Sequence, residues 1–455
     1  MRLVKFTFPA LLSFVVYTGS AQNFDPSVYS RLGIGNIADG TFSRNQGMGG
    51  AGVGLHHSYQ LNSLNPAALS SLKFTNFEFG IAGKSTVQRT KDDSQRGVSG
   101  SIQYISLAMP LHKRFVTQFG AKPFSNINYN DNFTETKGEK TFQVTKSGSG
   151  GLSEFFWGNA YNYKDWLMVG VNAGYILGQS IYDHSQFESG QSRFLTLTQK
   201  DERHLRISPG ILVTHEFKKS NSLKETFKKD TLIKDTLVKK VKSELTTGNW
   251  FVGFGVTGDF YNTMSANEEK YQSEVRYQYV PETATRNAYY DYINYKTDTI
   301  SIGSISGYSL PNTMKVGLSI YKPNKITLAL DYTFSNWSNF TYNTLNSSYH
   351  NQHIVALGAE IIPDYNSTKF YKRISYRAGL NYNMLPYIVA GQDIKQIQAN
   401  VGAGFVLPKS GVTLNTAITY GQRGTTSANL IKENYWMFSI GVIANTKWFV
   451  RRKHE

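Results

Sequence analysis

The clearest feature of the sequence is an alternation of apolar and polar residues with a period of two, which predicts β-strands. Residues 435–450 show it best, with one apolar face made of Trp436, Phe438, Ile440, Val442, Ala444, Thr446, Trp448 and Val450. The other face, which includes Ser439, Gly441 and Asn445, is more polar. Aromatic residues at both ends of an apolar stripe are typical of a membrane-spanning strand, because Trp and Tyr settle at the two headgroup interfaces. For this segment alone, an edge strand of a soluble sandwich is the alternative.

The same pattern recurs along the chain in fourteen segments of about ten residues, which is the length of a tilted strand that crosses a bilayer. They lie near residues 73–86, 98–109, 113–128, 150–163, 166–181, 203–216, 248–263, 312–321, 326–336, 351–362, 372–383, 394–406, 411–422 and 434–449. The sequence therefore predicts an all-β protein, a transmembrane antiparallel β-barrel of about 14 strands over residues 72–450.

The connections between these segments alternate in length. Short or moderate ones fall at 110–112, 163–165, 322–325, 363–371 and 407–411, and longer ones at 87–97, 129–149, 182–202, 264–311, 337–350, 384–393 and 423–433. Outer-membrane barrels have short periplasmic turns and long external loops, so this parity predicts a barrel with an even strand number. The last strand would then pair with the first, with Trp436 at the outer interface and Trp448 at the periplasmic one.

Two connections stand apart. Residues 217–247, expected on the periplasmic side, are rich in Lys and predict either a solvated charged insertion or a docking element for another protein. Residues 264–311 are rich in Tyr and predict either an external recognition surface or a hairpin that extends the barrel rim. A protein partner, if the chain has one, would bind through one of these two regions.

Composition supports a β-rich membrane protein. Aromatic residues make up 14% of the chain, Gly occurs 40 times, and Cys is absent. Mean hydropathy is −0.36, and no apolar run after the N-terminus approaches the ~20 residues that a membrane-spanning helix needs. A helical membrane protein is excluded, and without Cys there is neither a lipoprotein anchor nor a disulfide framework.

The N-terminus reads as an export signal at residues 1–21. Arg2 and Lys5 precede an apolar core at residues 6–16, and small residues at 19–21 form a cleavage site. A cleaved signal exports the chain, and together with the barrel pattern it predicts a location in the outer membrane of a Gram-negative cell. The formal charge of +16 then indicates attraction to outer-membrane lipid and lipopolysaccharide, with no nucleic acid as partner.

Residues 22–71 have no sustained period and are rich in Gly, which predicts a compact irregular segment packed against other backbone. This segment ends in Asn65-Pro66-Ala67-Ala68-Leu69 before the first strand. In this motif the chain resembles the N-terminal hatch of the FadL-type outer-membrane transporters of hydrophobic compounds. Residues 148–161 and the closing stretch from 421 to Trp448 and Phe449 resemble the branch of that superfamily found in Bacteroidota.

The resemblance implies a fourteen-stranded barrel plugged by the hatch, with Asn65, Pro66 and Ala67 as the hatch motif. It also implies that hydrophobic ligands enter from outside and leave sideways beside a kinked third strand. Here the third strand contains Gly120 and Pro123. Proline cannot donate to the ladder, so it marks either such a lateral-gate kink or an early end of the strand.

Four aromatic residues are candidates for interface anchors: Trp337, Trp436, Trp448 and Phe449. Trp337 lies one residue out of phase with the strand before it, so it could anchor only if that strand has already ended. A basic tail at residues 451–455 follows the last strand in place of the aromatic terminus usual for barrel insertion.

No arrangement of residues predicts an enzyme, a cofactor or a metal site. The adjacent His56 and His57 predict a surface or hydrogen-bonded pair rather than metal ligands. The inward-facing Asp331, Glu360 and Arg377 predict a polar lumen, with or without a network among them.

Two functions follow from these expectations. The first is passive uptake of hydrophobic small molecules, fatty-acid-like or aromatic, with hatch gating and lateral exit. The alternative is a non-transporting accessory subunit of an outer-membrane secretion or barrel-assembly complex. An apolar tunnel to the wall would favour the first, and a lumen filled with packed polar side chains would argue against it.

Overall fold

A computed structural model describes residues 27–38, 40–188, 193–217, 249–280, 289–338, 340, 349–407 and 410–446. The predicted signal at 1–21, the Lys-rich insertion at 217–247 beyond Phe217, and the basic tail lie outside these residues. Among the described residues, no helix has the length and apolar character that crossing a bilayer requires.

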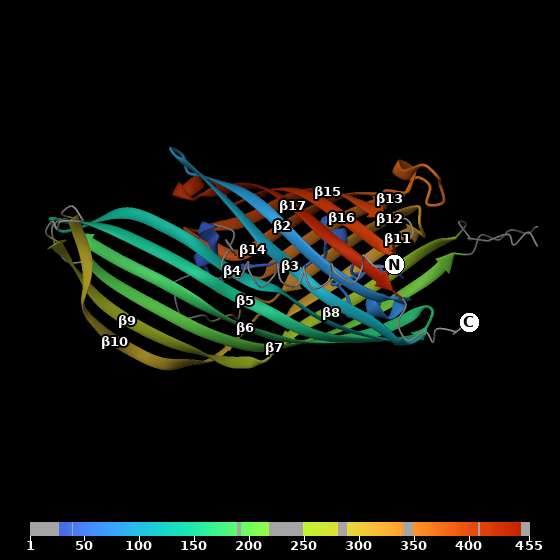
Figure 1. Ribbon diagram of the computed structural model, residues 1–455, viewed down its shortest axis with the longest axis horizontal. Helices are drawn as coiled ribbons and strands as arrows, with labels where there is room; N and C mark the ends of the chain where they lie inside the picture. Colours follow the sequence, from blue (N-terminus) through green and yellow to red (C-terminus); the bar gives the residue numbers. More distant parts are fainter. Residues whose placement is uncertain are drawn as a thin grey trace, which may run out of the picture.

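The architecture is a closed antiparallel β-barrel of fourteen strands (Figure 1). In chain order they are β2 (Thr75–Arg89), β3 (Ser94–His112), β4 (Phe115–Lys137), β5 (Lys140–Lys164), β6 (Leu167–Glu188), β7 (Arg193–Phe217), β8 (Trp250–Tyr261), β11 (Thr313–Lys322), β12 (Ile326–Ser335), β13 (Gln352–Ile361), β14 (Ser375–Val389), β15 (Gln392–Val406), β16 (Val412–Arg423) and β17 (Lys432–Thr446). The last strand pairs antiparallel with the first, and Ile440 lies opposite Ile81. The predicted class and strand number are confirmed.

The alternation within strands sorts side chains between the outside and the lumen. On β17, Trp436 is 59% exposed and Phe438 is 47% exposed, whereas Tyr435, Ser439 and Ile443 are buried. Other strands repeat this pattern with exposed Leu, Ile, Val and aromatic side chains. An apolar outer surface around a polar interior is the arrangement that a barrel in a bilayer requires.

Several predicted external loops are instead extensions of strands. Residues 129–149 belong mostly to β4 and β5, and residues 182–202 to β6 and β7. Residues 264–311 form a hairpin of β9 (Thr263–Val280) and β10 (Tyr289–Ser309), so that region extends the barrel rim. Beyond the end of β8, β9 continues the wall by pairing with β7, for example Leu197 with Tyr271.

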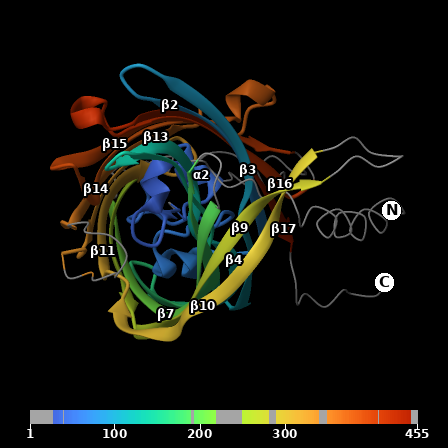
Figure 2. The ribbon, with the colours of Figure 1, turned by 90° about the vertical axis from the view of Figure 1, so that its left-hand side faces the viewer.

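The N-terminal part of the chain lies inside the barrel (Figure 2). We call residues 27–38 and 40–74 the lumenal segment. It contains short elements only: a 3-10 turn η1 (Val28–Arg31), β1 (Asn36–Ile37), one helical turn α2 (Ser43–Gln46) and a 3-10 helix η2 (Pro66–Ser71). Phe42, Met48, Ala51 and Ala67 in this segment are 0% exposed.

The barrel wall is split between β3 and β4. Their pairing runs from His112 opposite Phe115 only as far as Ile105 opposite Ala121. Beyond that point β3 stays with β2 and β4 stays with β5, and Figure 1 shows the outer ends of β3 and β4 diverging. Two residues of β4 pair with β1 instead: Asn126 lies opposite Asn36, and Ser125 lies opposite Ile37.

Candidate functional site

Glycines allow the lumenal segment to contact the backbone of the wall. A Cβ at Gly54 would lie 2.8 Å from the carbonyl oxygen of Gly317 and 2.9 Å from that of Gly253. A Cβ at Gly379 on β14 would collide with the backbone of Met48 and Gly49. Glycine is needed on both sides because any side chain there would push the segment away from the wall.

The predicted hatch motif fastens the end of the segment. The Asn65 side chain accepts a hydrogen bond from the Ala67 N–H at 3.0 Å and so caps η2. Its amide group donates to the Ile211 carbonyl on β7 at 3.0 Å. Pro66 packs against Gly170 of the wall so closely that a Cβ on Gly170 would lie 2.5 Å from the carbonyl carbon of Pro66. Asn65 and Ala67 are fully buried. All three motif residues therefore lie where the lumenal segment contacts the wall.

A buried ion-pair network joins the segment to the wall near β13 and β14. Glu360 accepts from Arg44 Nη2 at 3.0 Å and from Arg377 Nε at 2.6 Å. Arg377 Nη1 also donates to Asn415 at 2.9 Å. Two cations therefore share one carboxylate away from water. Glu360 and Arg377 were expected in a polar lumen, but Arg44 was missed because the lumenal segment has no period.

Asp331, the third expected lumenal residue, holds a different part of the segment. Its Oδ2 accepts hydrogen bonds from the backbone N–H of Gly52 at 2.6 Å and of Val53 at 2.8 Å. It is 4% exposed. A carboxylate that binds two backbone donors orients the loop between them, so Asp331 positions the segment without contacting Glu360.

We expect Asp331→Asn to loosen this loop by about 1–3 kcal/mol, because an amide cannot accept both N–H groups as strongly as a carboxylate. Hydrogen exchange at Gly52 and Val53 would measure the change. The matched control is Asp364→Asn, since Asp364 accepts from the Asn366 N–H in an exposed connection. Equal protection at residues 52 and 53 in wild type and variant would contradict the role of Asp331.

A second network of charges lies on the opposite side of the lumen. Arg206 on β7 pairs with Glu154 on β5, and Asp259 on β8 pairs with Lys315 on β11 at 3.1 Å. Arg206 also lies 3.7 Å from Asp259, and Lys122 on β4 lies 3.7 Å from Glu154. Three cations thus share two carboxylates. The sequence did signal them, since Glu154, Arg206 and Asp259 each precede an outward-facing Phe or Ile on a strand.

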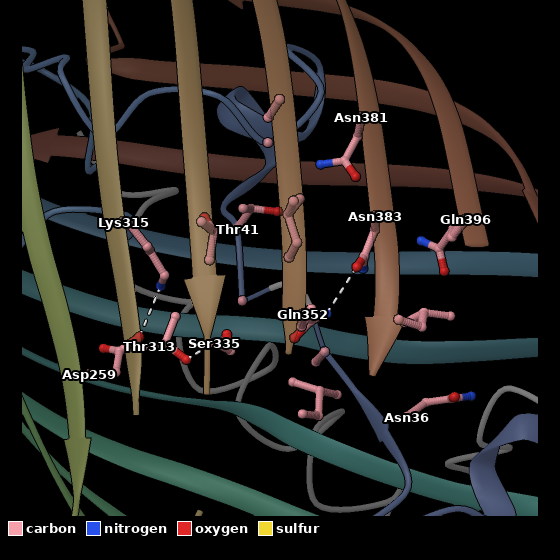
Figure 3. Close-up of a pocket in the computed structure, with 18 of the residues that line it drawn as sticks. Asn36, Thr41, Asp259, Thr313, Lys315, Ser335, Gln352, Asn381, Asn383 and Gln396 are labelled. Atoms are coloured by element: carbon pink, nitrogen blue, oxygen red, sulfur yellow. Dashed lines mark hydrogen bonds and ion pairs between the residues drawn. The ribbon is translucent and has the colours of Figure 1, made fainter. Parts of the chain in front are cut away.

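The lumenal segment and the wall enclose a cavity of about 210 Å³ (Figure 3). Charged residues of the second network line one part of it, and Asn381, Asn383, Gln396, Gln398 and Asn400 line another. Apolar side chains line much of the remainder, both aromatic (Phe124, Tyr261, Trp337 and Tyr387) and aliphatic (among them Ile34, Leu64, Leu310 and Leu385). The lining is therefore mixed, with charges and amides rather than the continuous apolar surface that a hydrocarbon tunnel predicts.

The predicted kink lies where the wall divides. Pro123 is opposite Ser153 on β5, and the register shifts before Ser125, so Phe124 forms a bulge with its side chain buried. The pairing of β4 with β3 ends two residues before Pro123, at Ala121. Gly120 packs closely, since a Cβ there would lie 2.7 Å from the Ile105 carbonyl oxygen. The strand does not end at Pro123; β4 continues to Lys137.

The aromatic candidates separate into three groups. Trp436 is exposed on the outer face and packs near Tyr420, with ring centroids 4.9 Å apart. Trp448 and Phe449 lie outside the described residues. Trp337 is 1% exposed and packs on Phe340 and Tyr349 in the lumen, so its prediction as an interface anchor is wrong. The chain after Ser335 turns inward, where the Asn336 N–H donates to the Asn312 carbonyl.

Tryptophan fluorescence in brominated lipid would check this assignment. Trp436→Phe should remove emission that the bromine atoms quench, because Trp436 faces the bilayer. Trp337→Phe should remove emission that is not quenched, because Trp337 is enclosed. Quenching of Trp337 equal to that of Trp436 would contradict the lumenal position.

Both histidines of the adjacent pair, His56 and His57, make hydrogen bonds within the protein. His56 Nε2 lies 2.9 Å from the Tyr321 hydroxyl, and burial, followed by the Arg44 cation, lowers the pKa of His56 to about 4. His57 Nδ1 accepts from the Tyr59 N–H. Within the described ranges, no group of three His, Cys, Asp or Glu side chains could hold a metal ion.

Comparison with protein families gives a match over nearly the whole chain: the family described as BamG matches residues 3–455. The chain belongs to the BamG family. No match is found among curated proteins.

Three solved structures similar to this BamG-family chain are described as channels or transporters. The CymD monoaromatic hydrocarbon channel is 13% identical, with a TM-score of 0.51 over 90% of this chain and 98% of that one. The toluene transporter TbuX of Ralstonia pickettii is 11% identical, with a TM-score of 0.51 over 88% and 97%. The toluene transporter TodX of Pseudomonas putida is 12% identical, with a TM-score of 0.51 over 90% and 97%.

At these identities the likeness establishes the fold of the BamG-family chain and no more. The likeness to CymD, TbuX and TodX shows the β-barrel fold that the FadL resemblance implied, and these neighbours are described as channels or transporters. Assignment to a Bacteroidota branch stays a prediction.

Proposed function

We propose that this BamG-family chain is a non-transporting outer-membrane barrel that serves as an accessory subunit of an outer-membrane secretion or barrel-assembly complex. The main support is the fastening of the lumenal segment. Ion pairs at Glu360, hydrogen bonds at Asp331 and Asn65, and glycine contacts at Gly379 hold it to the wall. A segment held this way blocks the lumen and rigidifies the barrel.

Energetics support a fixed plug over a gate. Moving the segment would take Arg44 away from Glu360, which would keep only Arg377 as its partner, and would break the two hydrogen bonds that Asp331 accepts from Gly52 and Val53. A hydrogen bond to a charged group contributes about 1.5–3 kcal/mol. Passive uptake has no energy source to meet that cost beyond the burial of the ligand itself.

The proposed partner contacts lie on the outer rim and the periplasmic side. The β9–β10 hairpin extends the wall beyond β8 and β11 (Figure 1). The Lys-rich insertion at 217–247 is the second candidate. Outer-membrane lipid and lipopolysaccharide would surround the apolar outer face.

Affinity purification from native membranes tests this role. We expect a partner protein in fixed ratio to the full-length chain, and its loss when either residues 264–309 or 218–247 are replaced by a short turn. A control variant shortened only at the exposed connection 363–371 should retain the partner. Recovery of the barrel without any protein in fixed ratio would overturn the proposal.

Passive uptake is the second candidate, and the split beside Pro123 favours it. Lys122, Pro123 and Phe124 line the lumenal cavity and also lie at the edge that β3 leaves. A fatty-acid-like molecule could place its carboxylate near Lys122 and exit sideways through the split, while the lumenal segment acts as a hatch. Burial of its apolar surface, at roughly 25 cal/mol per Å², would drive entry.

Uptake by a deletion strain, measured with a panel of lipids and aromatic compounds, tests the second candidate. Loss of uptake for one class, restored by wild type and reduced in Lys122→Met, would support it. Unchanged uptake of every compound would exclude it.

A further inference from the structure

The outer half of β3 has one open edge. From Ser94 to Tyr104 this strand pairs with β2 on one side, for example Gly100 with Gly83. On its other side, none of the described residues pairs with this strand between Ser94 and Tyr104. In an antiparallel ladder, about half the N–H and C=O groups of an edge strand point away from its single partner.

The facing edge of β4 is, in contrast, covered by the lumenal segment from Phe124 to Asn128. The Ala38 N–H donates to the Phe124 carbonyl at 2.9 Å, and the Ser27 N–H donates to the Asn128 carbonyl at 2.9 Å. The Asn128 N–H donates to Ser30 Oγ at 3.1 Å. The lumenal segment thus takes the place of a neighbouring strand for β4 and leaves β3 without one.

The open edge lies at the level of the lipid-facing band. The exposed Trp436 is opposite Ser85, which is opposite Val98 on β3. Lower down, Val442 is opposite Phe79, which is opposite Ile105. The register therefore aligns residues 98–105 with the outward stripe of β17 from Trp436 to Val442. Hydrocarbon cannot hydrogen-bond the free backbone groups at this depth, and open sheet edges are not stable there.

We propose that an extended segment of a partner outer-membrane protein adds to this edge of β3 as an antiparallel strand. The inference rests on the proposed role as an accessory subunit and adds a contact within the membrane to the two contacts proposed at the β9–β10 hairpin and at residues 217–247. Main-chain hydrogen bonds supply affinity in such strand addition, and alternate side chains supply specificity. Val98 is 66% exposed on the outer side, so the added strand presents apolar residues to lipid at alternate positions.

The geometry of the membrane excludes a second copy of this chain as the occupant. β3 runs from its external connection at 90–93 to a short turn at 113–114, so every copy runs in the same direction. Two copies related by an axis along the membrane normal would also tilt in opposite senses, so their edges would cross rather than pair. The partner must supply a strand that runs from the periplasmic side outward.

Space exists where such a strand would emerge. A groove of about 490 Å³ lies between Gln95 of β3 and residues 128–133 of β4, beside the lumenal segment. Its lining includes Asn130, Asn132 and the ion pair of Arg31 with Asp131 at 3.2 Å. Amide and charged groups there can bind the backbone of a chain that leaves the sheet for water.

Site-directed cross-linking tests the inference, because the chain has no Cys of its own. Single variants Val98→Cys and Ile102→Cys on the open edge carry a photoactivated thiol reagent in native membranes. Controls are Leu357→Cys on β13 and Val401→Cys on β15, which are 50% and 56% exposed on strands that do not neighbour β3. Wild-type chain with an affinity tag is purified in parallel to establish whether a partner exists.

We expect both edge variants to form adducts with the same outer-membrane protein that co-purifies with wild type. The adduct from residue 102 should map about four residues earlier in the partner than that from residue 98, since the strands are antiparallel. The control variants should not form these adducts. Three results would overturn the inference: adducts with lipid only, adducts with a second copy of this chain, or adducts whose positions in the partner do not follow the antiparallel order. A partner that co-purifies but does not cross-link at the edge overturns the strand addition and leaves the accessory role intact, whereas no partner at all rejects that role itself.

Discussion

Glu360→Ala is expected to lower the free energy of unfolding by about 3–5 kcal/mol, because it leaves two buried guanidinium groups without their carboxylate. Arg44 and Arg377 lie 3.0 Å and 2.6 Å from Glu360 and are buried beside it. Equilibrium unfolding by urea or guanidinium in lipid bilayers measures the loss. Glu360→Gln should fall between wild type and Glu360→Ala, since it keeps the shape and one acceptor but not the charge.

The control for this prediction is Glu135→Ala on the outer part of β4. Glu135 pairs with Lys137 at 3.3 Å, and both side chains are largely exposed. Exposed pairs contribute at most about 1 kcal/mol. Equal effects of Glu360→Ala and Glu135→Ala would mean that the lumenal network is hydrated and does not hold the segment.

Gly379→Val is expected to displace the lumenal segment and to open a conducting path. A Cβ at this position collides with the backbone of Met48 and Gly49, and Gly49 has a φ of +68°, so neither side can accept a side chain. Overpacking of this kind costs about 1–3 kcal/mol. Planar-bilayer recording should show currents from Gly379→Val that are absent from wild type.

The matched substitution is Gly303→Val on β10, where a Cβ added to the glycine would have nothing within 4 Å. We expect it to change stability by less than about 0.5 kcal/mol and to leave the lumen closed. A Gly379→Val barrel that stays closed and as stable as Gly303→Val would show that the segment does not depend on this contact.

The strands that cross the bilayer could be predicted from sequence because lipid imposes a period of two on them. Val401 and Leu380 face outward and their neighbours face the lumen, so apolar and polar residues alternate in the sequence. The outer halves of β4 to β7 were missed because they lie beyond the lipid-facing band and need no apolar face. Residues 129–149 therefore looked like a loop although they form a hairpin.

The lumenal site was only partly predictable. Glu360 and Arg377 sit on strands, so their inward direction follows from alternation, but Arg44 lies in an irregular segment whose direction no period reveals. Trp337 was misplaced for a related reason. An aromatic residue just after a strand is typical of an interface, yet the chain folds inward there and buries the ring against Phe340.

One residue, Pro123, indicated from the sequence that the wall divides, but nothing in the sequence indicated how far the division extends. Pro123 predicted a local loss of pairing, and the pairing with β3 does end at Ala121. That β1 would then occupy the edge of β4 depends on a contact between residues about ninety positions apart, Asn36 and Asn126. Such a long-range pairing has no signal in a single sequence.

A lumen that the fastened segment closes should not conduct hydrophobic molecules. Proteoliposomes that contain only this protein provide the decisive test, with entry of a fluorescent fatty acid and of a monoaromatic compound measured against protein-free vesicles. We predict equal entry with and without the protein. Saturable entry that requires the protein and falls in Lys122→Met would contradict the closed lumen and establish uptake through the split beside Pro123.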